Sequence, residues 1–258
     1  MKFLVPLASA VLIANASADD PMAKAEWISA QSEISQGKAV QTIIRMTVDD
    51  GWHTYWENPG EGGMEISIKA DLPEGWSIGE LQYPVPKRFM TGELPGFGYE
   101  GEIDFPLTLT PPADAAGKMP PLRVKLSWLT CNDNSCVPGD AALELPAQTD
   151  AVAVARAYEN LPRPLPNATL AADFTDETAL LFLSIPEDAE INPAACEVFP
   201  VTANVIDAGA KPQFQKQEGN SRVWISTAAK SEYLSEKKPS LEILLVAPNK
   251  KSWIITTE

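Results

Sequence analysis

The clearest feature of the chain is the alternation of apolar and polar residues over short segments. Residues 39–48 read AVQTIIRMTV, so that Val40, Ile44, Met46 and Val48 would share one face of a strand. Residues 122–130, LRVKLSWLT, alternate in the same way, with Leu, Val, Leu and Trp on one face and Arg, Lys and Ser on the other. A period of two over so few residues predicts β-strands that bury one face.

Turn residues separate further segments of this kind. Asp-Asp-Gly at 49–51, Asn-Pro-Gly at 58–60 and Pro-Glu-Gly at 73–75 are typical turn sequences. Between and around them, strands are expected at 26–33, 65–70, 105–110 and 141–145. Several short strands at this spacing predict a sandwich of two antiparallel sheets.

The second half of the chain predicts a smaller β-domain. Residues 150–160, DAVAVARAYEN, form the best helix candidate, and the following LPRPLPNA has three prolines within five residues, which exclude helix and central strand. We interpret 149–167 as a short helix with a Pro-rich linker. Strands are expected beyond it at 179–185, 201–206, 222–227, 241–247 and 253–257, within a domain spanning 168–258.

The N-terminus has the pattern of a secretory signal. One Lys precedes an apolar run, and Ala16-Ser17-Ala18 has the small-x-small form of a cleavage site. We predict a signal peptide over 1–18, cleaved near Ala18, followed by the first domain over 19–148. No later stretch approaches the roughly 20 apolar residues of a membrane helix. The mature protein is therefore expected to be exported, either periplasmic or secreted, in a compartment where disulfides persist.

Charge narrows the class of partner. The chain has 20 Lys and Arg against 35 Asp and Glu, a net charge of −15. An acidic chain without basic clusters argues against nucleic acid and anionic membrane surfaces as partners.

The candidate chemistry lies in WLTCNDNSCVPG, residues 128–139, where Cys131 and Cys136 are separated by four turn-forming residues. A hairpin would bring the two sulfurs together, and the pair could be a structural disulfide, a metal site or an exchanging dithiol. A six-residue loop gives a staple of only about 2 kcal/mol. A structural zinc needs more ligands than these two cysteines and the lone His53 supply. No Lys, Arg or His adjoins the pair, so nothing marks a strongly activated thiolate.

Two other features could carry chemistry. Cys196 lies among apolar residues and is expected to be a buried, inert thiol. Copper handling by the cysteines with Met64 or Met90 has no clustered Met and His pattern to support it.

Three blocks of sequence together resemble a known family. GWHTYWENPGEGG (51–63), YPVPKRFMTGELPGFGYEGEIDFPLTL (83–109) and WLTCNDNSCVPGDAALEL (128–145) are similar to the periplasmic N-terminal domain of the thiol:disulfide interchange protein DsbD, including ScsB-type reductases. The resemblance covers about residues 25–148, and a weaker likeness to ScsB-type ectodomains continues beyond it.

The resemblance implies an immunoglobulin-like sandwich and a redox role. Cys131 and Cys136 would form the redox pair, with Cys136 entering the mixed disulfide. The donor would be a thioredoxin-like or membrane-bound thiol reductase, and the acceptors periplasmic disulfide proteins. Since the sequence holds neither a thioredoxin-like nor a membrane domain, we expect that donor to be a separate polypeptide. No cofactor is expected. A cap loop would shield the pair, with Phe97 at its tip, and the site-lining residues would be His53, Tyr55, Tyr99 and Glu100.

The alternative is a non-enzymatic β-sandwich that binds or scaffolds, with a purely structural disulfide. Sandwiches host many unrelated functions, so the fold alone does not decide whether the chain is an enzyme.

Overall fold

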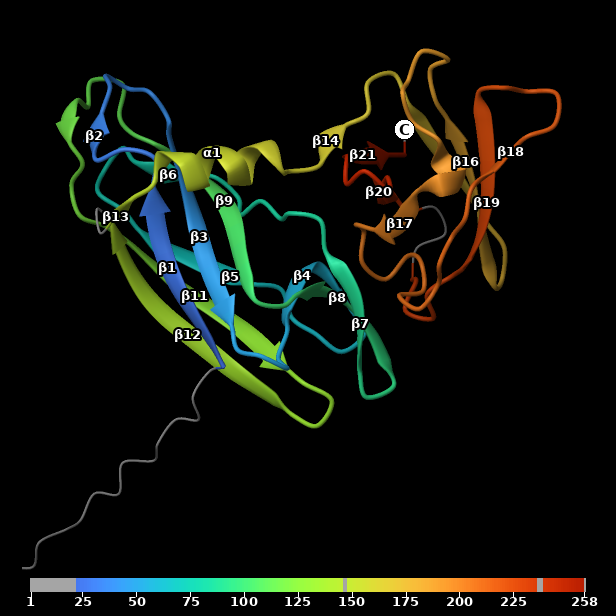
Figure 1. Cartoon of the computed structure of the whole chain (residues 1–258), viewed down its shortest axis with the longest axis horizontal. Helices are drawn as coiled ribbons and strands as arrows, with labels where there is room; N and C mark the ends of the chain where they lie inside the picture. The colour runs from blue at the N-terminus through green and yellow to red at the C-terminus, as the bar shows by residue number, and fades with distance from the viewer. Residues whose placement is uncertain (1–21, 146–147, 236–238, 258) are drawn as a thin grey trace, which may run out of the picture.

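The computed structural model describes residues 22–145, 148–235 and 239–257. The predicted signal peptide, 1–18, lies outside them. The fold is all-β: two β-rich units lie side by side, joined by the helix α1 (Ala151–Glu159), as Figure 1 shows. The first unit is an immunoglobulin-like sandwich, and a smaller β-rich unit follows it.

Two sheets of the first unit enclose its main core. The larger has the order β13-β1-β3-β9-β6, and the other the order β12-β11-β5. The alternating residues of β3 and β11 are buried as predicted, among them Val40, Ile44 and Leu126, each with no exposed surface. The strands are β1 (Ala23–Ser29), β3 (Val40–Val48), β5 (Ser67–Asp71), β6 (Ser77–Ile78), β9 (Glu102–Thr110), β11 (Leu122–Cys131), β12 (Cys136–Leu145) and β13 (Gln148–Thr149), with β2 (Glu33–Ile34) and β10 (Gly117–Lys118) forming a small separate sheet.

A third sheet, with the order β4-β8-β7, completes the first unit on the side that faces the second (Figure 1). It contains β4 (Thr54–Gly60), β7 (Lys87–Thr91) and β8 (Leu94–Tyr99). Strands β7 and β8 were not predicted from the sequence, and β4 runs through Asn58-Pro59-Gly60, which was expected to form a turn. Strands β7 and β8 form a hairpin in which Thr91 pairs with Leu94.

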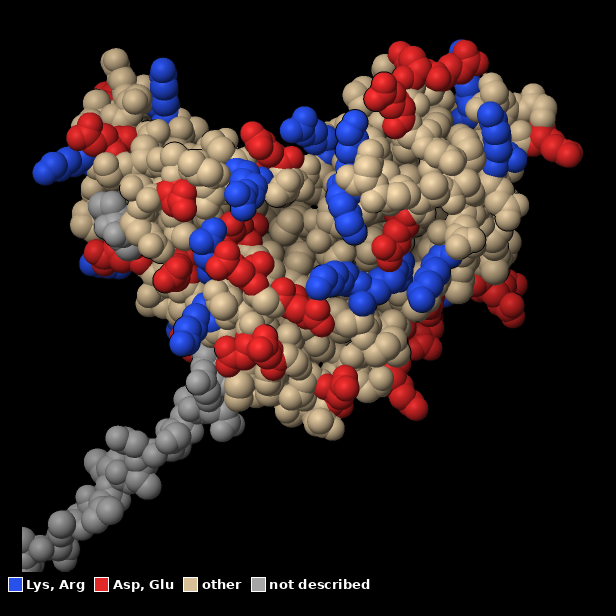
Figure 2. All heavy atoms as spheres, viewed as in Figure 1, with Lys and Arg blue, Asp and Glu red and all other residues tan. Residues whose placement is uncertain are grey.

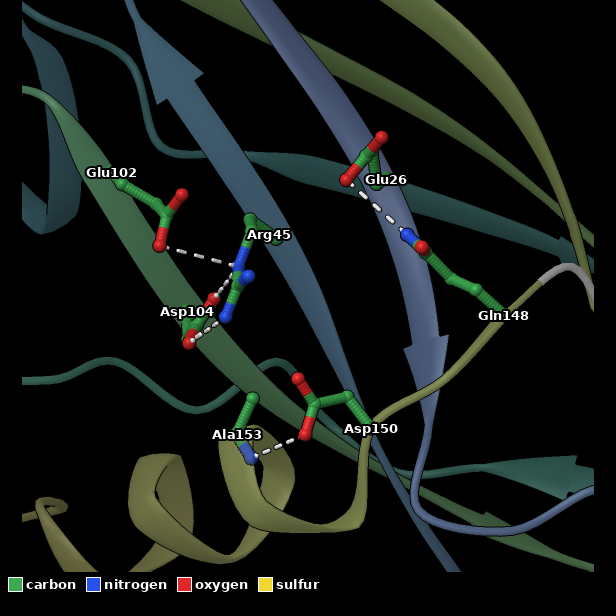
Figure 3. A network of polar contacts seen from close by, with 7 residues as sticks. All are labelled: Glu26, Arg45, Glu102, Asp104, Gln148, Asp150 and Ala153. Carbon is green, nitrogen blue, oxygen red and sulfur yellow. Dashed lines mark hydrogen bonds and ion pairs between the residues drawn. The ribbon is translucent and has the colours of Figure 1, made fainter.

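The start of α1 is held against the larger sheet by the Asp150 N–H, which donates to the Ser29 carbonyl of β1 at 3.0 Å, and polar side chains lie around this point (Figure 3). Asp150 caps the helix, its carboxylate accepting from the Ala153 N–H at 2.9 Å. Close by, Arg45 on β3 donates to both carboxylate oxygens of Asp104 on β9, at 2.6 and 2.8 Å. The carboxylates of Asp104, Glu102 and Asp150 all raise the pKa of Arg45 above its ordinary value, so this cation stays charged.

The predicted connection packs on both units. Buried Val154 and Ala157 of α1 contact Ile28 and Ile43 of the larger sheet. After the helix, β14 (Arg163–Pro164) pairs in parallel with a strand of the second unit. A groove of about 880 Å³ lies alongside this connection, and Figure 2 shows the hollow between the two units with basic side chains along one wall. Its lining includes Arg163, Lys250 and Lys251.

The second unit packs two four-stranded sheets around a separate core. Their orders are β14-β21-β20-β17 and β15-β16-β19-β18. The strands are β15 (Thr169–Phe174), β16 (Thr178–Ser184), β17 (Glu197–Pro200), β18 (Gln215–Lys216), β19 (Val223–Ala229), β20 (Glu242–Val246) and β21 (Ser252–Thr256), with a 3₁₀ turn, η1, at Pro193–Ala195.

One strand expected in this unit is wrong. Residues 201–206 form turns, and the strand is β17, just before them. Val205 and Ile206 are nevertheless buried in the second core, and Ile206 makes only an isolated bridge to Lys230. Apolar residues in a turn can also be buried. The hydrophobicity of residues 201–206 therefore resembled that of a strand, although these residues do not pair as one.

Candidate functional site

The two cysteines close the mouth of the β11–β12 hairpin with a disulfide. Cys131 is the last residue of β11 and Cys136 the first of β12, and the two pair directly with Cα atoms 4.1 Å apart. Pairing continues without interruption from there to Leu122 opposite Leu145. The hairpin with the two sulfurs facing each other, expected from the sequence, is confirmed.

Asn132 organises the four residues between the cysteines. Its side-chain oxygen accepts from the N–H groups of Asn134 and Ser135, at 2.8 and 2.9 Å. The Asn132 N–H donates to the Ser135 carbonyl at 2.9 Å, which closes the turn. These local bonds form an Asx-type turn that suits a hairpin of this loop length. The loop conformation is therefore fixed by its own polar residues as well as by the disulfide.

The two cysteines differ sharply in exposure. Cys131 has no exposed surface, whereas Cys136 is exposed. Thiol–disulfide exchange requires an incoming thiolate to reach one sulfur while the other leaves. The geometry therefore favours attack at Cys136, with Cys131 as the leaving group.

His53 lies directly beside Cys131 on the opposite edge from Cys136. The two residues exchange backbone hydrogen bonds, from the His53 N–H to the Cys131 carbonyl at 2.9 Å and in reverse at 3.0 Å. Directly opposed residues of antiparallel strands project their side chains from the same face. His53, Cys131 and Cys136 thus form a row across the sheet, and one face carries all three side chains.

An aromatic cluster covers the His53 end of this row. The Phe89 ring lies 3.8 Å from the His53 ring, centroid to centroid, and the Tyr55 ring meets His53 edge-on at 5.4 Å. Thr91 links the cluster, since its hydroxyl lies 3.1 Å from His53 Nε2 and 3.4 Å from the Tyr55 hydroxyl. His53 is only 6 % exposed and Tyr55 is fully buried. The sheltered side of the disulfide is therefore lined by His53 and the residues packed on it.

Burial decides the charge state around the pair. It lowers the pKa of His53 below its ordinary 6.5, against the opposing pull of the carboxylates of Glu100 and Asp133. Burial also raises the pKa of the Tyr55 hydroxyl. The imidazole and the phenol are both neutral at pH 7, so neither supplies a cation that would promote a thiolate.

Glu100 lies at the rim of the site. It lines a shallow hollow of about 330 Å³ together with His53, Phe89, Met90 and the turn residues 132–134. Its carboxylate pairs with the Lys87 ammonium at 3.0 Å, and both side chains are largely exposed. The structure therefore brings three predicted lining residues together: His53, Tyr55 and Glu100.

Phe97, predicted as the tip of a swinging cap, is not placed over the disulfide. It has no exposed surface and meets Trp56 and Phe199 edge-on, at 6.0 and 5.8 Å. The neighbouring Gly96 and Gly98 make space for another aromatic ring. A Cβ on either would lie 2.8–2.9 Å from the Phe89 ring, so both positions leave room for that ring. Phe89 therefore covers the site side of β8, while Phe97 points to the other.

Tyr99 shares the core-facing side of β8 with Phe97. It is 5 % exposed, packs edge-on against Phe105 at 5.3 Å, and donates its hydroxyl to the Pro84 carbonyl at 2.7 Å. These contacts anchor the end of the hairpin in the main core and do not line the cysteines.

The residues that sequence reasoning missed are Phe89 and Thr91. The stretch KRFMTGELPGFGY has two alternating runs around a Gly-containing turn, which is a hairpin signal. That signal indicates that alternate side chains of residues 87–91 share one face of the hairpin. Only the tertiary packing shows that this face meets His53.

The third cysteine does not join the site. Cys196 is a free thiol whose Sγ lies 3.4 Å from the Asn192 carbonyl oxygen. It is buried, as predicted from its apolar neighbours. Burial raises its pKa to about 11. In the described part of the chain, no three His, Cys, Asp or Glu side chains gather in a way that could hold a metal ion.

Comparison with known proteins places this geometry in a family. The family model described as "Thiol:disulfide interchange protein DsbD, N-terminal" matches residues 19–148. Among solved structures, the N-terminal periplasmic domain of ScsB from Proteus mirabilis superposes with a TM-score of 0.66 at 18 % identity, over 92 % of this chain and 93 % of that one. No curated protein sequence matches the chain.

That solved structure shows the fold of both units, since it spans nearly the whole chain. Across residues 22–145, 148–235 and 239–257, no helix is long and apolar enough to cross a membrane. With a cysteine hairpin closed by a disulfide inside the matched residues, the chain belongs to the DsbD N-terminal family of thiol:disulfide interchange proteins.

Proposed function

We propose that the chain is an exported thiol–disulfide exchange protein that passes electrons through Cys131 and Cys136. The observation that carries the proposal is the unequal exposure of the pair, with Cys136 at the surface and Cys131 buried beside His53. A purely structural bridge has no need of one accessible sulfur, whereas an exchanging pair has.

Reduction proceeds in two exchange steps. A thiolate of a reduced donor attacks Cys136 Sγ, the Cys131–Cys136 bond breaks, and Cys131 leaves as the thiolate. The second donor thiol then attacks its own half of the mixed disulfide and releases Cys136. The donor dithiol has become a disulfide, and two electrons with two protons reside on the Cys131 and Cys136 thiols.

Transfer to the acceptor reverses the order. The Cys136 thiolate attacks an acceptor disulfide, and Cys131 then attacks Cys136 Sγ to reform the internal bond and release the reduced acceptor. The neutral His53 and the nearby carboxylates do not activate the thiols strongly. The rate should therefore depend on the docked partner, which suits a relay more than an indiscriminate reductant.

The partners follow from this chemistry and from the family. The donor would be a thioredoxin-like domain or a membrane-bound thiol reductase, and the acceptors would be oxidised periplasmic proteins. Family membership supports a periplasmic location, and the predicted signal peptide agrees with it.

Trapping of a mixed disulfide tests the assignment. In a Cys196→Ser background, a Cys131→Ser variant keeps the accessible thiol and should form a mixed disulfide with an oxidised thioredoxin-like protein. The Cys136→Ser variant should trap little, because its remaining thiol is buried. Equal trapping by both variants would contradict the assignment of Cys136.

The reduction potential separates exchange from a structural role. Equilibration with glutathione should give a value above about −300 mV, since structural bridges usually lie below it. A lower value would support the alternative, a non-enzymatic sandwich with a structural disulfide.

A further inference from the structure

Strand β7 presents alternate residues to two different parts of the protein. Phe89 and Thr91 face His53 and the site. Arg88, between Lys87 and Phe89, points the other way into the second unit. The same five-residue strand therefore contacts both the redox site and the second unit, whose role the family match leaves open because it ends at residue 148.

Arg88 is bonded almost entirely to the second unit. Its Nη2 donates to the Val198 carbonyl at 2.6 Å and its Nη1 to the Ala208 carbonyl at 3.0 Å. Its Nε lies 3.3 Å from a carboxylate oxygen of Glu197. The Arg88 side chain is only 16 % exposed. A buried guanidinium with directed bonds of this kind fixes the position of the strand that carries it.

The guanidinium also lies between two phenyl rings, one from each unit. Its central carbon is 4.9 Å from the Phe97 ring centroid and 4.8 Å from that of Phe199. Trp56 meets both rings edge-on, at 6.0 and 6.2 Å. Cation–π and aromatic contacts thus flank the bonds to the two carbonyls and shelter most of the guanidinium from water.

The second unit contributes an edge strand, β17, to the contact around Arg88. Among the described strands, β17 ends the order β14-β21-β20-β17, so one of its sides has no neighbouring strand. Arg88 binds its Val198 carbonyl, and buried Asn58 on β4 donates to its Pro200 carbonyl at 2.8 Å. Side chains of the first unit therefore satisfy carbonyls that an edge strand leaves unpaired.

We propose that the second unit is a positioning element for the redox site, in which Arg88 fastens β7 to β17 and so keeps Phe89 over His53 beside the cysteine pair. This inference rests on the proposed function for its purpose, although access to Cys131 can be measured without it. Strand β7 is itself an edge of its three-stranded sheet and pairs only with β8 in the described structure. Short edge strands open locally at low cost unless something else holds them.

Alkylation of Cys131 by iodoacetamide in a Cys136→Ser, Cys196→Ser background measures this shelter, because Cys131 is the buried cysteine beside His53. Arg88→Gln should raise the second-order rate constant by about tenfold, the change that loss of one charge-assisted hydrogen bond gives to a local opening equilibrium. Arg88→Lys retains the charge without the forked geometry and should give a smaller increase. Arg123→Gln, at an exposed arginine paired with Glu144 at the far end of the β11–β12 hairpin, is the matched control and should leave the rate unchanged.

A double-mutant cycle shows whether Arg88 acts through Phe89. Phe89→Ala alone should also speed alkylation of Cys131, and adding Arg88→Gln to it should give little further increase, because the shelter is already lost. Independent, multiplicative effects would overturn the proposal, and so would an Arg88→Gln rate equal to that of the Arg123→Gln control.

Unfolding midpoints identify variants that are folded enough to interpret. Should Arg88→Gln fail to fold, the same cycle with Arg88→Lys decides the matter. Because alkylation needs no partner protein, a failure of mixed-disulfide trapping would leave this result intact, and an unchanged alkylation rate would leave the exchange function intact.

Discussion

The cost of reducing the disulfide follows from the size of the loop it closes. Cys131 and Cys136 are five positions apart, so the closed loop spans six residues. The chain-entropy model gives about 2 kcal/mol of stabilisation for a loop of that length, against nearly 5 for one of 100 residues. The hairpin has independent support, because β11 and β12 pair over ten positions and Asn132 bonds within the turn. We therefore expect the reduced protein to stay folded.

Urea unfolding of the oxidised and reduced forms measures this cost. The free energy of unfolding should fall by about 2 kcal/mol on reduction, with little change in the slope against urea concentration. The Cys131→Ser, Cys136→Ser double variant serves as a permanently open control. A loss above about 4 kcal/mol, or unfolding on reduction, would refute the reasoning and identify a staple that the fold requires.

Three further perturbations have expected outcomes. Burial, reinforced by neighbouring carboxylates, raises the pKa of Glu57 to about 7, so folding favours its protonated form. The free energy of unfolding of the wild type should therefore fall by about 1–3 kcal/mol between pH 5 and 8. Urea titrations should show a flatter pH profile for Glu57→Gln, and an unchanged profile for Glu74→Gln, at an exposed site. Gly98→Ala should lower the melting temperature clearly, because a Cβ there would lie 1.9 Å from the Thr54 carbonyl oxygen; an unchanged melting curve would contradict the close packing of β4 on β8. Burial lowers the pKa of His53 in the folded protein, so folding favours its neutral imidazole. Stability is therefore unaffected by this group above pH 6.5 and falls as the pH drops below that value, because the unfolded state binds the proton more readily. Unfolding midpoints at pH 5 and above pH 6.5 should show that acidification destabilises the wild type more than His53→Gln.

Local pattern predicted the elements whose signal is contained in neighbouring residues. Alternation identified β3 and β11 almost to the residue, and the polar NDNS stretch identified the hairpin that joins the cysteines. Each of these depends on side-chain alternation or on turn chemistry within a few positions. In the sheet β4-β8-β7, prolines and glycines interrupt the strand pattern of β4 and β8, whereas β7 alternates and carries a usable hairpin signal.

The site shows the same division between local and long-range information. The sequence by itself determined the cysteine pair, its hairpin and, through family resemblance, the placement of His53, Tyr55 and Glu100 near it. The same resemblance assigned the cover to Phe97, whereas the glycines that flank Phe97 make room for Phe89 across the hairpin. Which of two aromatic residues faces the site depends on strand register, and a shift of one residue reverses every side chain.

The contact between the two units around Arg88 depends on tertiary structure alone. Arg88 and Phe199 are more than 100 positions apart, and neither carries a pattern in its own neighbourhood that names the other. Their contact forms because an edge strand has unpaired carbonyls, and a cationic fork with aromatic neighbours satisfies them. Sequence periodicity determines which residues are buried; only the packing of distant strands determines what they are buried against.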